Sequence, residues 1–311
     1  MLDPKKLRTA PIWARVASSV IPHLPRGRYR LARWLALRAP APFWGRMPAA
    51  LGGAWFYCNP SDSNSRAVYF TGRYEPQETA LLLELLRPGM TFVDVGANWG
   101  YFTLLAASRL GPSGRVIALE PDPRLFQLLQ ANVDRNRFTG VVVRQVAAAD
   151  RCGQTSFAQC DEGSENWGVS HLTDDSRNGT CMVATCPLDD LLDEVGVDCI
   201  DLLKMDIEGA EELALRGMAA GLARHRYKRL LLEVHPQMLK QRGRTVADVF
   251  TLLRQANYRG WEIDHAPRTT WRMSYAKKIN VRDLLRPALK ETCAEQWPHL
   301  LWTAPGVDDM K

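Results

Sequence analysis

Hydrophobic residues follow two different periods along the central part of the chain. Short runs dominated by apolar positions predict buried strands, and longer segments with apolar positions three or four apart predict helices. Strands are expected at residues 91–95, 116–120, 141–146, 199–205, 229–234, 258–264 and 299–304. Helices are expected at residues 101–110, 123–136, 188–195, 211–223 and 246–256. Such alternation predicts an α/β domain, built on a parallel sheet with helices on both faces.

Three segments outside this alternation carry further signals. Residues 54–58 and 67–70 predict two short strands joined by a polar turn, and residues 78–86 predict a helix that ends before a Pro-Gly pair. Residues 151–186 are polar and contain several glycines, which indicates a loop or hairpin insertion. Insertions at strand ends of α/β folds commonly shape the ligand site.

The first central strand leads into a turn of small residues. Strand 91–95 contains Asp94, and the turn that begins at Gly96 leads into helix 101–110. The next strand ends in Glu120. Open parallel sheets hold a nucleoside on such a strand–turn–helix–strand unit, in which the closing acidic residue binds the ribose hydroxyls.

The residues of the turn indicate which nucleoside fits. A dinucleotide fingerprint needs glycine at three positions, but here Asn98 and Tyr101 occupy the second and third. Asp94 would also repel a phosphate, so a nicotinamide-dependent oxidoreductase is the weaker alternative. S-Adenosylmethionine carries an ammonium and a sulfonium but no phosphate, and it suits this carboxylate better. Asn98 is an acceptable replacement for glycine because asparagine is enriched at positive φ.

A second group of polar residues follows two later strands. Lys204, Asp206 and Glu208 alternate along the end of one strand, and Glu233 and His235 along the end of the next. Alternate side chains share one side of a sheet, and several acids beside an apolar sheet are costly unless they pair or bind something. The alternative is a purely structural ion pair between Lys204 and Asp206.

Composition excludes several other classes of protein. No apolar run approaches the roughly 18 residues that would span a bilayer, and we recognise no secretory leader. The seven cysteines are an odd number without C-x-x-C spacing. This pattern predicts reduced thiols in the cytoplasm rather than a disulfide framework or a zinc site.

Positive charge is concentrated in residues 1–50. They hold ten Lys or Arg and one acid, a balance of +9, so the remaining chain carries about −3 of the net +6. The segment also contains Trp13, Trp34 and Trp44, and a helical pattern at residues 29–39. We expect a helical lid on the domain, with an amphipathic stretch on an anionic membrane as the alternative. Nucleic-acid binding is disfavoured because the rest of the chain has no matching basic stripe.

Several of these segments together resemble the FkbM family of S-adenosylmethionine-dependent methyltransferases. The matching segments are residues 72–76, 93–103, 118–121, 188–191, 201–211 and 233–235. The resemblance covers residues 67–304 and implies the Rossmann-like class I methyltransferase fold, with a mostly parallel seven-stranded sheet whose last strand is antiparallel. We therefore expect a basic helical extension, residues 1–50, before a methyltransferase domain, residues 51–311, with its core at residues 72–304.

The resemblance also implies a reaction, the transfer of a methyl group to a hydroxyl oxygen of a secondary metabolite or sugar. The expected partner is a small-molecule hydroxyl acceptor and not a nucleic acid, and the sequence leaves the oligomeric state open. A membrane-peripheral enzyme acting on lipid-linked glycans is one alternative. A non-catalytic module that binds the methyl donor is another.

The expected donor site surrounds the turn. Asp94 and the turn amides would hold the methionyl end, Glu120 the ribose, and the backbone near Ala147 and Ala148 the adenine, while Glu75 would close over the cofactor. The donor-binding residues expected are Glu75, Asp94, Gly96, Ala97, Asn98, Gly100, Tyr101, Phe102, Thr103, Glu120, Pro121, Ala147 and Asp206.

The expected catalytic residues are His235, Asp206 and Glu208. A neutral His235 is the natural base, because an unperturbed histidine titrates near physiological pH. Asp206, Glu208 or Glu233 could serve instead, or could bind a divalent cation, for which three carboxylates suit magnesium better than zinc. His171 in the insertion is a further candidate base, although a solvated loop histidine is the simpler interpretation.

Overall fold

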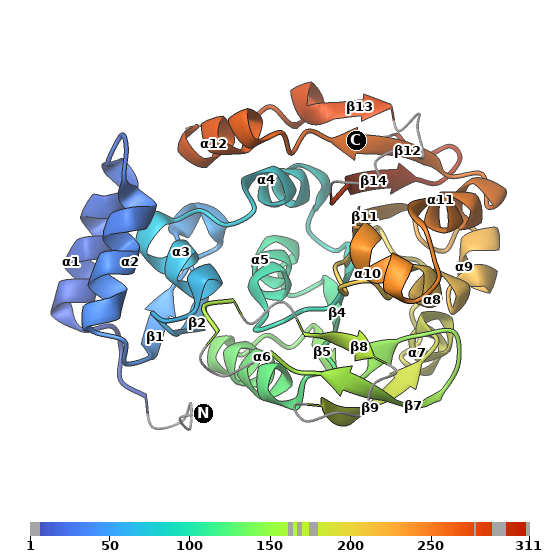
Figure 1. Ribbon diagram of the computed structural model, residues 1–311, viewed down its shortest axis with the longest axis horizontal. Helices are drawn as coiled ribbons and strands as arrows, with labels where there is room; N and C mark the ends of the chain where they lie inside the picture. Colours follow the sequence, from blue (N-terminus) through green and yellow to red (C-terminus); the bar gives the residue numbers. More distant parts are fainter. Residues whose placement is uncertain are drawn as a thin grey trace.

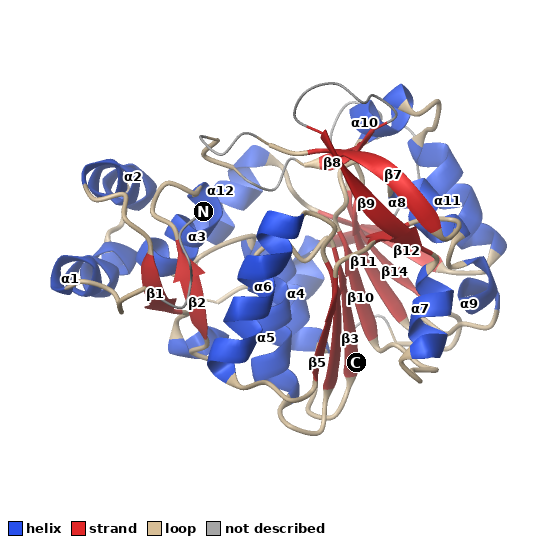
Figure 2. Ribbon diagram, turned by 90° about the horizontal axis from the view of Figure 1, so that it is seen from below, coloured by secondary structure: helices blue, strands red, loops and turns tan. Residues whose placement is uncertain are grey.

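One sheet of eight strands runs through the centre of the molecule (Figures 1 and 2). The computed structural model describes residues 7–160, 164–166, 170–173, 180–276, 278–287 and 297–308. The strands, in their order across the sheet, are β13 (Leu285–Pro287), β12 (Arg259–Ile263), β14 (His299–Thr303), β11 (Arg229–Glu233), β10 (Leu202–Met205), β3 (Thr91–Val95), β4 (Arg115–Leu119) and β5 (Val141–Arg144). The strands from β11 to β5 are parallel, whereas β14 runs antiparallel to both of its neighbours.

This sheet confirms the predicted fold class, a Rossmann-like class I methyltransferase fold with an antiparallel last strand. Strand β3 has the predicted bounds, and the other predicted strands of the sheet differ by at most three residues at either end. The predicted number of seven strands is wrong, because β13 adds an eighth at the edge beside β12. Three residues are too few for a visible alternation, and Pro287 is tolerated there because an edge strand can lack a ladder donor.

The helices cover both faces of the sheet, as predicted (Figure 2). From residue 76 onward, the described α-helices are α4 (Pro76–Leu85), α5 (Tyr101–Leu110), α6 (Pro123–Asn136), α7 (Leu188–Glu194), α8 (Glu211–Arg216), α9 (Ala219–Ala223), α10 (Pro236–Gln241), α11 (Val246–Gln255) and α12 (Pro267–Tyr275). Helices α5 and α6 have the predicted bounds, but the single helix predicted at 211–223 is two. At the break, a Cβ on Gly217 would lie 1.9 Å from the carbonyl oxygen of Ala149.

Alternate residues of the strands point into two hydrophobic cores, one on each face of the sheet. In β3, Phe92 packs into the core that also contains residues of α4 and α5, whereas Val93 and Val95 pack into the core with residues of α7, α8 and α11. Asp94 lies on the same side as Phe92 because strand side chains alternate. This side of the sheet therefore holds a fully buried carboxylate among apolar residues, with 1% of its surface exposed.

The N-terminal part of the chain packs against the first of these cores. It contains α1 (Ile12–Val20), α2 (Arg28–Arg38), α3 (Ser63–Thr71), the antiparallel pair β1 (Phe43–Arg46) and β2 (Trp55–Cys58), and short 3₁₀ helices at Ile21–His23 and Ala49–Leu51. A further 3₁₀ helix, Val281–Leu284, lies between α12 and β13. The predicted strand at 67–70 is wrong. Helix α3 forms there because Asp62 caps its start, with the Ser65 amide donating to Asp62 Oδ2 at 2.7 Å, and Gly72 ends it at φ 67°.

The described residues also form a second, smaller sheet of four strands. Its strands are β6 (Ala147–Ala148), β9 (Thr180–Cys186), β7 (Gly153–Ala158) and β8 (His171–Thr173), in that order. Strands β7 and β9 form an antiparallel pair, and β9 also runs parallel to β6. Part of the predicted insertion therefore forms a hairpin of β7 and β9, which pairs with β6. The division of the chain into residues 1–50 and 51–311 stays a prediction.

Two asparagines of α6 hold β2 in place. Asn132 Oδ1 accepts from the Tyr57 amide and its Nδ2 donates to the Trp99 carbonyl, both at 2.7 Å. One turn later, Asn136 makes two bonds of 2.7 Å to the amide and carbonyl of Trp55. These side chains therefore supply hydrogen bonds that a neighbouring strand would otherwise supply.

We expect Asn132→Leu to lower the free energy of unfolding by about 3 kcal/mol, because each buried backbone group left without a partner costs about 1–3 kcal/mol. Asn132 is fully buried, so water cannot replace it. The measurement is urea unfolding followed by circular dichroism. Gln127→Leu, at an exposed position of the same helix, is the control; equal losses in both variants would contradict this role for Asn132.

Candidate active site

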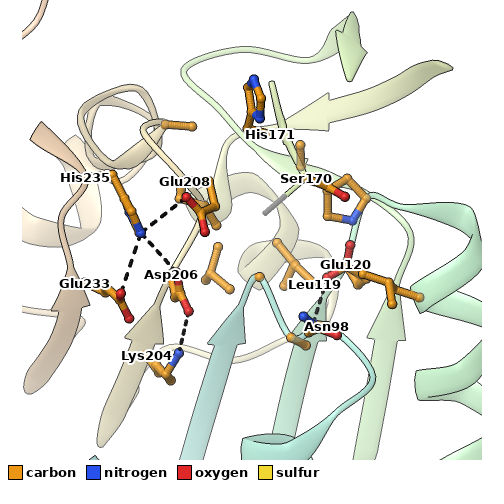
Figure 3. A pocket seen from close by; sticks show the side chains of 18 of the residues that line it. Asn98, Leu119, Glu120, Ser170, His171, Lys204, Asp206, Glu208, Glu233 and His235 are labelled. Carbon is orange, nitrogen blue, oxygen red and sulfur yellow. Dashed lines mark hydrogen bonds and ion pairs between the residues drawn. The ribbon is translucent and has the colours of Figure 1, made fainter. Parts of the chain in front are cut away.

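A cavity of about 430 Å³ lies at the carboxyl ends of β3, β4, β10 and β11 (Figure 3). This is the edge at which open α/β sheets bind ligands. The turn after β3 and the residues after β4 form one wall, and the residues after β10 and β11 form the opposite wall. The second sheet contributes Phe157, His171 and Leu172.

Most of the residues predicted for the donor site line this cavity. Those that do are Glu75, Gly96, Ala97, Asn98, Tyr101, Phe102, Glu120, Pro121, Ala147 and Asp206. Asp94, Gly100 and Thr103 lie outside the lining. The Thr103 hydroxyl donates to Asp94 Oδ2 at 2.6 Å, and burial raises the pKa of Asp94. This bond joins β3 to the first helical turn of α5. Asp94 therefore stabilises the loop between these two elements without lining the cavity.

The turn itself adopts left-handed backbone conformations. Asn98 has φ 54°, as its type predicts, and its side chain accepts from the Trp99 amide at 2.7 Å. Gly96 has φ 81°, and a Cβ there would lie 2.0 Å from the carbonyl oxygen of Asp206. Glycine is therefore required at this position by the end of β10, in addition to any requirement from a ligand.

Glu120 is held at the cavity wall by backbone amides. Its two carboxylate oxygens accept from the amides of Asn98, at 2.7 Å, and Asp122, at 2.8 Å. Burial raises the pKa of Glu120 to about 8. A carboxylate fixed in this way keeps lone pairs for a diol, as the sequence predicted for a ribose.

On the opposite wall, Lys204 is surrounded by acids and an aromatic ring. Its Nζ lies 3.3 Å from Asp206 Oδ2, 4.0 Å from Glu75 Oε2 and 4.6 Å from the centroid of the Phe102 ring. Burial opposes the charge of the lysine, but Asp206 and Glu75 raise its pKa. The ion pair that the sequence offered as an alternative is therefore present, and it lines the cavity.

His235 is the centre of the carboxylate cluster (Figure 3). Its Nδ1 donates to Glu211 Oε1 at 2.9 Å, and its Nε2 faces Glu208, Glu233 and Asp206 at 3.4, 3.6 and 3.9 Å. Burial lowers the pKa of His235, but Glu211 and the other acids raise it to about 9. This shift favours the imidazolium over the neutral imidazole that the sequence predicted, and the catalytic role of His235 stays a prediction.

Glu208 has the properties of a base near neutrality. It occupies a left-handed conformation with φ 50° in the turn after β10, which costs free energy for a non-glycine residue. Burial raises the pKa of Glu208 to about 7, although His235 opposes the shift. The strained turn thus places a carboxylate that is half ionised at neutral pH beside a cationic ring.

Glu211, the first residue of α8, positions His235. It is fully buried and accepts from both the Gly209 amide and the His235 ring. The sequence could not show this contact, because it needs β10 and β11 to be neighbours. The other lining residues that the sequence did not single out include Asn64, Tyr74, Asn166, Gln237, Met238 and Trp297.

Behind Glu233 lies a second titratable cluster of Glu78, His265 and His299. Glu78 Oε1 lies 2.5 Å from His265 Nε2 and 2.9 Å from His299 Nδ1, and the two rings stack with centroids 3.5 Å apart. Burial raises the pKa of Glu78, but the two histidines lower it on balance. His299 Nε2 is also 3.7 Å from Glu233 Oε1, so this cluster supports the wall of the cavity from behind.

Two overlapping groups in the cavity have the spacing of metal ligands. One is Asp206, Glu208 and His235, and the other is Glu75, Asp206 and Glu233. The three carboxylates predicted as ligands, Asp206, Glu208 and Glu233, are therefore divided between the two groups. The first group fits a divalent cation better, because Glu211 orients His235 as outer-shell carboxylates orient metal-binding histidines, whereas Lys204 already supplies a cation to the second.

The order of the strands and the position of this cavity are those of the class I methyltransferase fold. A model of the methyltransferase FkbM domain matches residues 94–259, more than half of the chain. The chain belongs to the FkbM family of methyltransferases. Membership of this family sets aside the nicotinamide-dependent alternative.

Three curated relatives show how far the similarity extends. The 2-O-methyltransferase NoeI of Sinorhizobium fredii is 29% identical over 159 residues, which cover 46% of this chain and 63% of NoeI. The 31-O-demethyl-FK506 methyltransferase FkbM of Streptomyces tacrolimicus is 32% identical over 161 residues, or 43% and 61% of the two chains. The AMB antimetabolite synthetase AmbE of Pseudomonas aeruginosa is 28% identical over 256 residues, 66% of this chain but 12% of AmbE. The chain thus spans less than two thirds of the length of each.

The charge on His235 predicts how stability depends on pH. With a pKa of about 9 when folded and 6.5 when unfolded, the bound proton stabilises the fold fully below pH 6.5, and this contribution disappears as the pH rises to about 9. We expect wild type to lose up to about 3 kcal/mol more than His235→Gln across this range. Urea unfolding at several pH values measures the difference, with His23→Gln at an exposed position as the control. Parallel curves for wild type and His235→Gln would show that the ring is neutral.

Proposed function

We propose that the protein transfers the methyl group of S-adenosylmethionine to a hydroxyl oxygen of a small-molecule acceptor. The observation that carries this proposal is the division of the cavity into two unlike walls. Glu120 and the turn at residues 96–98 form one wall, and the cluster of Asp206, Glu208 and His235 forms the other (Figure 3). A nucleoside fits the first wall, and an acceptor that must lose a proton fits the second.

On the donor side, Glu120 would accept hydrogen bonds from the ribose, and the backbone at Ala147 would face the adenine. Glu75 is the carboxylate that we assign to the methionyl ammonium. Its Oε2 is buried at the cavity without a hydrogen-bond partner among the described residues, and an ammonium group offers it a donor. Asp94, which lies behind the lining, would contribute through the shape of the turn rather than by contact.

On the acceptor side, the reaction is an in-line displacement at the methyl carbon. The acceptor oxygen forms a bond to the methyl group, the bond from methyl to sulfur breaks, and the sulfur leaves as a neutral thioether with the electron pair. Glu208 would take the hydroxyl proton, since a pKa of about 7 suits a base at neutral pH. The His235 imidazolium would stabilise the negative charge that develops on the oxygen.

The walls around these groups favour a polar acceptor with several hydroxyl groups. Ser170, His171 and Gln237 line the cavity with polar atoms, and Trp297, which also lines it, offers an aromatic ring. A few placed polar groups with an aromatic face are typical of orienting contacts in small-molecule sites. A sugar, or a sugar-like part of a secondary metabolite, satisfies this description. His171 therefore becomes an acceptor contact in this proposal, rather than the base.

Asp206, Glu208 and His235 are also the residues that would hold a divalent cation. Oxygen-rich ligands with one imidazole are compatible with magnesium. The chemistry that such an ion supplies is a lower pKa for an acceptor hydroxyl. With the ion bound, His235 would be a neutral ligand and the ion would replace the positive charge of the imidazolium. Ser170, Gln237 and Trp297 would keep their proposed role in orienting the acceptor.

The donor half is tested by Glu120→Gln. An amide would present its NH₂ to groups that now donate to the carboxyl oxygens of Glu120. We expect S-adenosylmethionine to bind about 10- to 100-fold more weakly, because a buried hydrogen-bonding group left without a partner costs about 1–3 kcal/mol. Isothermal titration calorimetry measures the affinity. Glu84→Gln, at an exposed position of α4, should bind as wild type does. Unchanged affinity of Glu120→Gln would remove this residue from the donor site.

The acceptor half is tested by Glu208→Gln. We expect donor binding to be retained and the rate of methyl transfer to fall by about 10²- to 10⁴-fold, the usual contribution of a general base. The assay follows radioactive methyl transfer to a panel of sugars and polyhydroxylated metabolites. In wild type, the rate should rise as the pH passes through about 7, where Glu208 loses its proton. Donor binding without transfer to any acceptor would favour a binding module instead.

A further inference from the structure

Exposed hydrophobic side chains gather on the two N-terminal helices. The ten large hydrophobic side chains that are exposed in the described part of the chain include seven on α1 and α2. These seven are Ile12, Val16, Val20, Tyr29, Leu31, Trp34 and Leu37. An eighth, Trp271, lies on α12, which contacts α2 where Arg28 donates to the Ser274 carbonyl at 2.6 Å. We call these eight side chains the apolar patch.

The side chains of the apolar patch are spaced along α1 and α2 as on the apolar face of an amphipathic helix. Ile12, Val16 and Val20 follow one another at four-residue intervals and so form a stripe along α1, with 72, 57 and 53% of their surfaces exposed. On α2, Trp34 and Leu37 are three residues apart and 50 and 59% exposed. The opposite sides of both helices are buried against α3 through small residues, Ala14 on α1 and Ala32 and Ala36 on α2.

The charge around the patch has one sign. Residues 7–50 contain eight arginines and no lysine, aspartate or glutamate. Arg15, Arg30 and Arg38 are exposed on the same two helices, and the Arg38 guanidinium stacks 3.8 Å from the centroid of the Trp34 ring. On α12, Arg268 and Arg272 are exposed beside Trp271.

We propose that this surface docks on an anionic membrane, with the apolar patch in the boundary between headgroups and acyl chains and the arginines among the phosphates. Helices with aliphatic and Trp side chains on one face and arginines beside them bind in this way. Among the described helices, none is long and apolar enough to cross a bilayer. Figure 1 shows α1 and α2 together at one end of the molecule, away from the central sheet, where both can reach a flat surface.

The charge also decides against a second copy of the chain as the occupant. Pairing two patches would bring two arginine-rich segments without acids face to face, and like charges in contact are costly. Nucleic acid would use the arginines but would leave the aliphatic stripe on α1 exposed. An anionic lipid surface is the partner that satisfies both the charge and the apolar side chains.

The test is flotation of the full chain with vesicles. One set is phosphatidylcholine alone, and the other contains equal amounts of phosphatidylcholine and phosphatidylglycerol. We expect wild type to float with the anionic vesicles and to dissociate as salt is added. Val16→Ser/Trp34→Ser should weaken binding about ten-fold or more, and Arg15→Gln/Arg30→Gln about five-fold for each arginine.

Met182→Ser is the matched control, because Met182 is 60% exposed on β9, outside the patch. Unchanged unfolding curves and unchanged binding of S-adenosylmethionine show that each variant is folded and separate this test from that of the proposed function. The proposal is overturned if wild type floats with neither set, or if the patch variants float as wild type does. It is also overturned if light scattering shows a dimer that the patch variants abolish.

Discussion

Buried negative charge at the carboxyl edge of the sheet is the constraint on which the site depends. Glu75, Asp206 and Glu233 converge there, and the cationic groups within reach in the described structure are Lys204, His235 and His299. Buried carboxylates are costly unless cations or hydrogen bonds compensate them. Burial, followed by the neighbouring acids, raises the pKa of Glu233 well above its usual range. The cations of the described residues therefore do not keep all of these acids ionised.

This shortage of cations favours S-adenosylmethionine as the ligand more strongly than the glycine pattern does. A phosphate-bearing dinucleotide would add negative charge to the cluster, whereas S-adenosylmethionine brings a sulfonium and an ammonium. Gly96 also fits this explanation, since its missing side chain makes room for the carbonyl of Asp206. The turn and the acidic wall are therefore packed against each other, and a change in either alters the shape of the cavity.

Features that depend on local sequence could be predicted, and features that depend on tertiary contacts could not. Strand β3 and helices α5 and α6 have their predicted bounds, because their periodicity is local. Helix α3 was mistaken for a strand because its apolar residues are consecutive, although Asp62 and Gly72 gave the signals of its two ends. Pro236 and Pro267, at the first positions of the unpredicted helices α10 and α12, were comparable signals.

The same distinction applies to the site. Glu120, Asp206, Glu208 and His235 could be found because each follows a strand whose end is visible in the sequence. The partner of His235 could not be found, because Glu211 reaches it only across two neighbouring strands. That contact is the first of those that raise the pKa of His235, and the raised pKa favours the imidazolium where the sequence predicted a neutral base. Glu208, which we propose as the base, has a left-handed backbone conformation that the sequence could not reveal.

The basic N-terminal helices connect to this site through one side chain of the insertion. Arg33 of α2 and Arg66 of α3 both contact Glu165, at 2.7 and 3.2 Å, and the adjacent Asn166 lines the cavity. Arg33 and Glu165 are both well exposed, and an exposed ion pair holds little free energy and is screened by salt. A surface that draws arginines toward lipid phosphates would compete with Glu165 for Arg33. A lid on the domain and a membrane-binding surface are therefore compatible roles for α2, since different side chains of one helix would serve them.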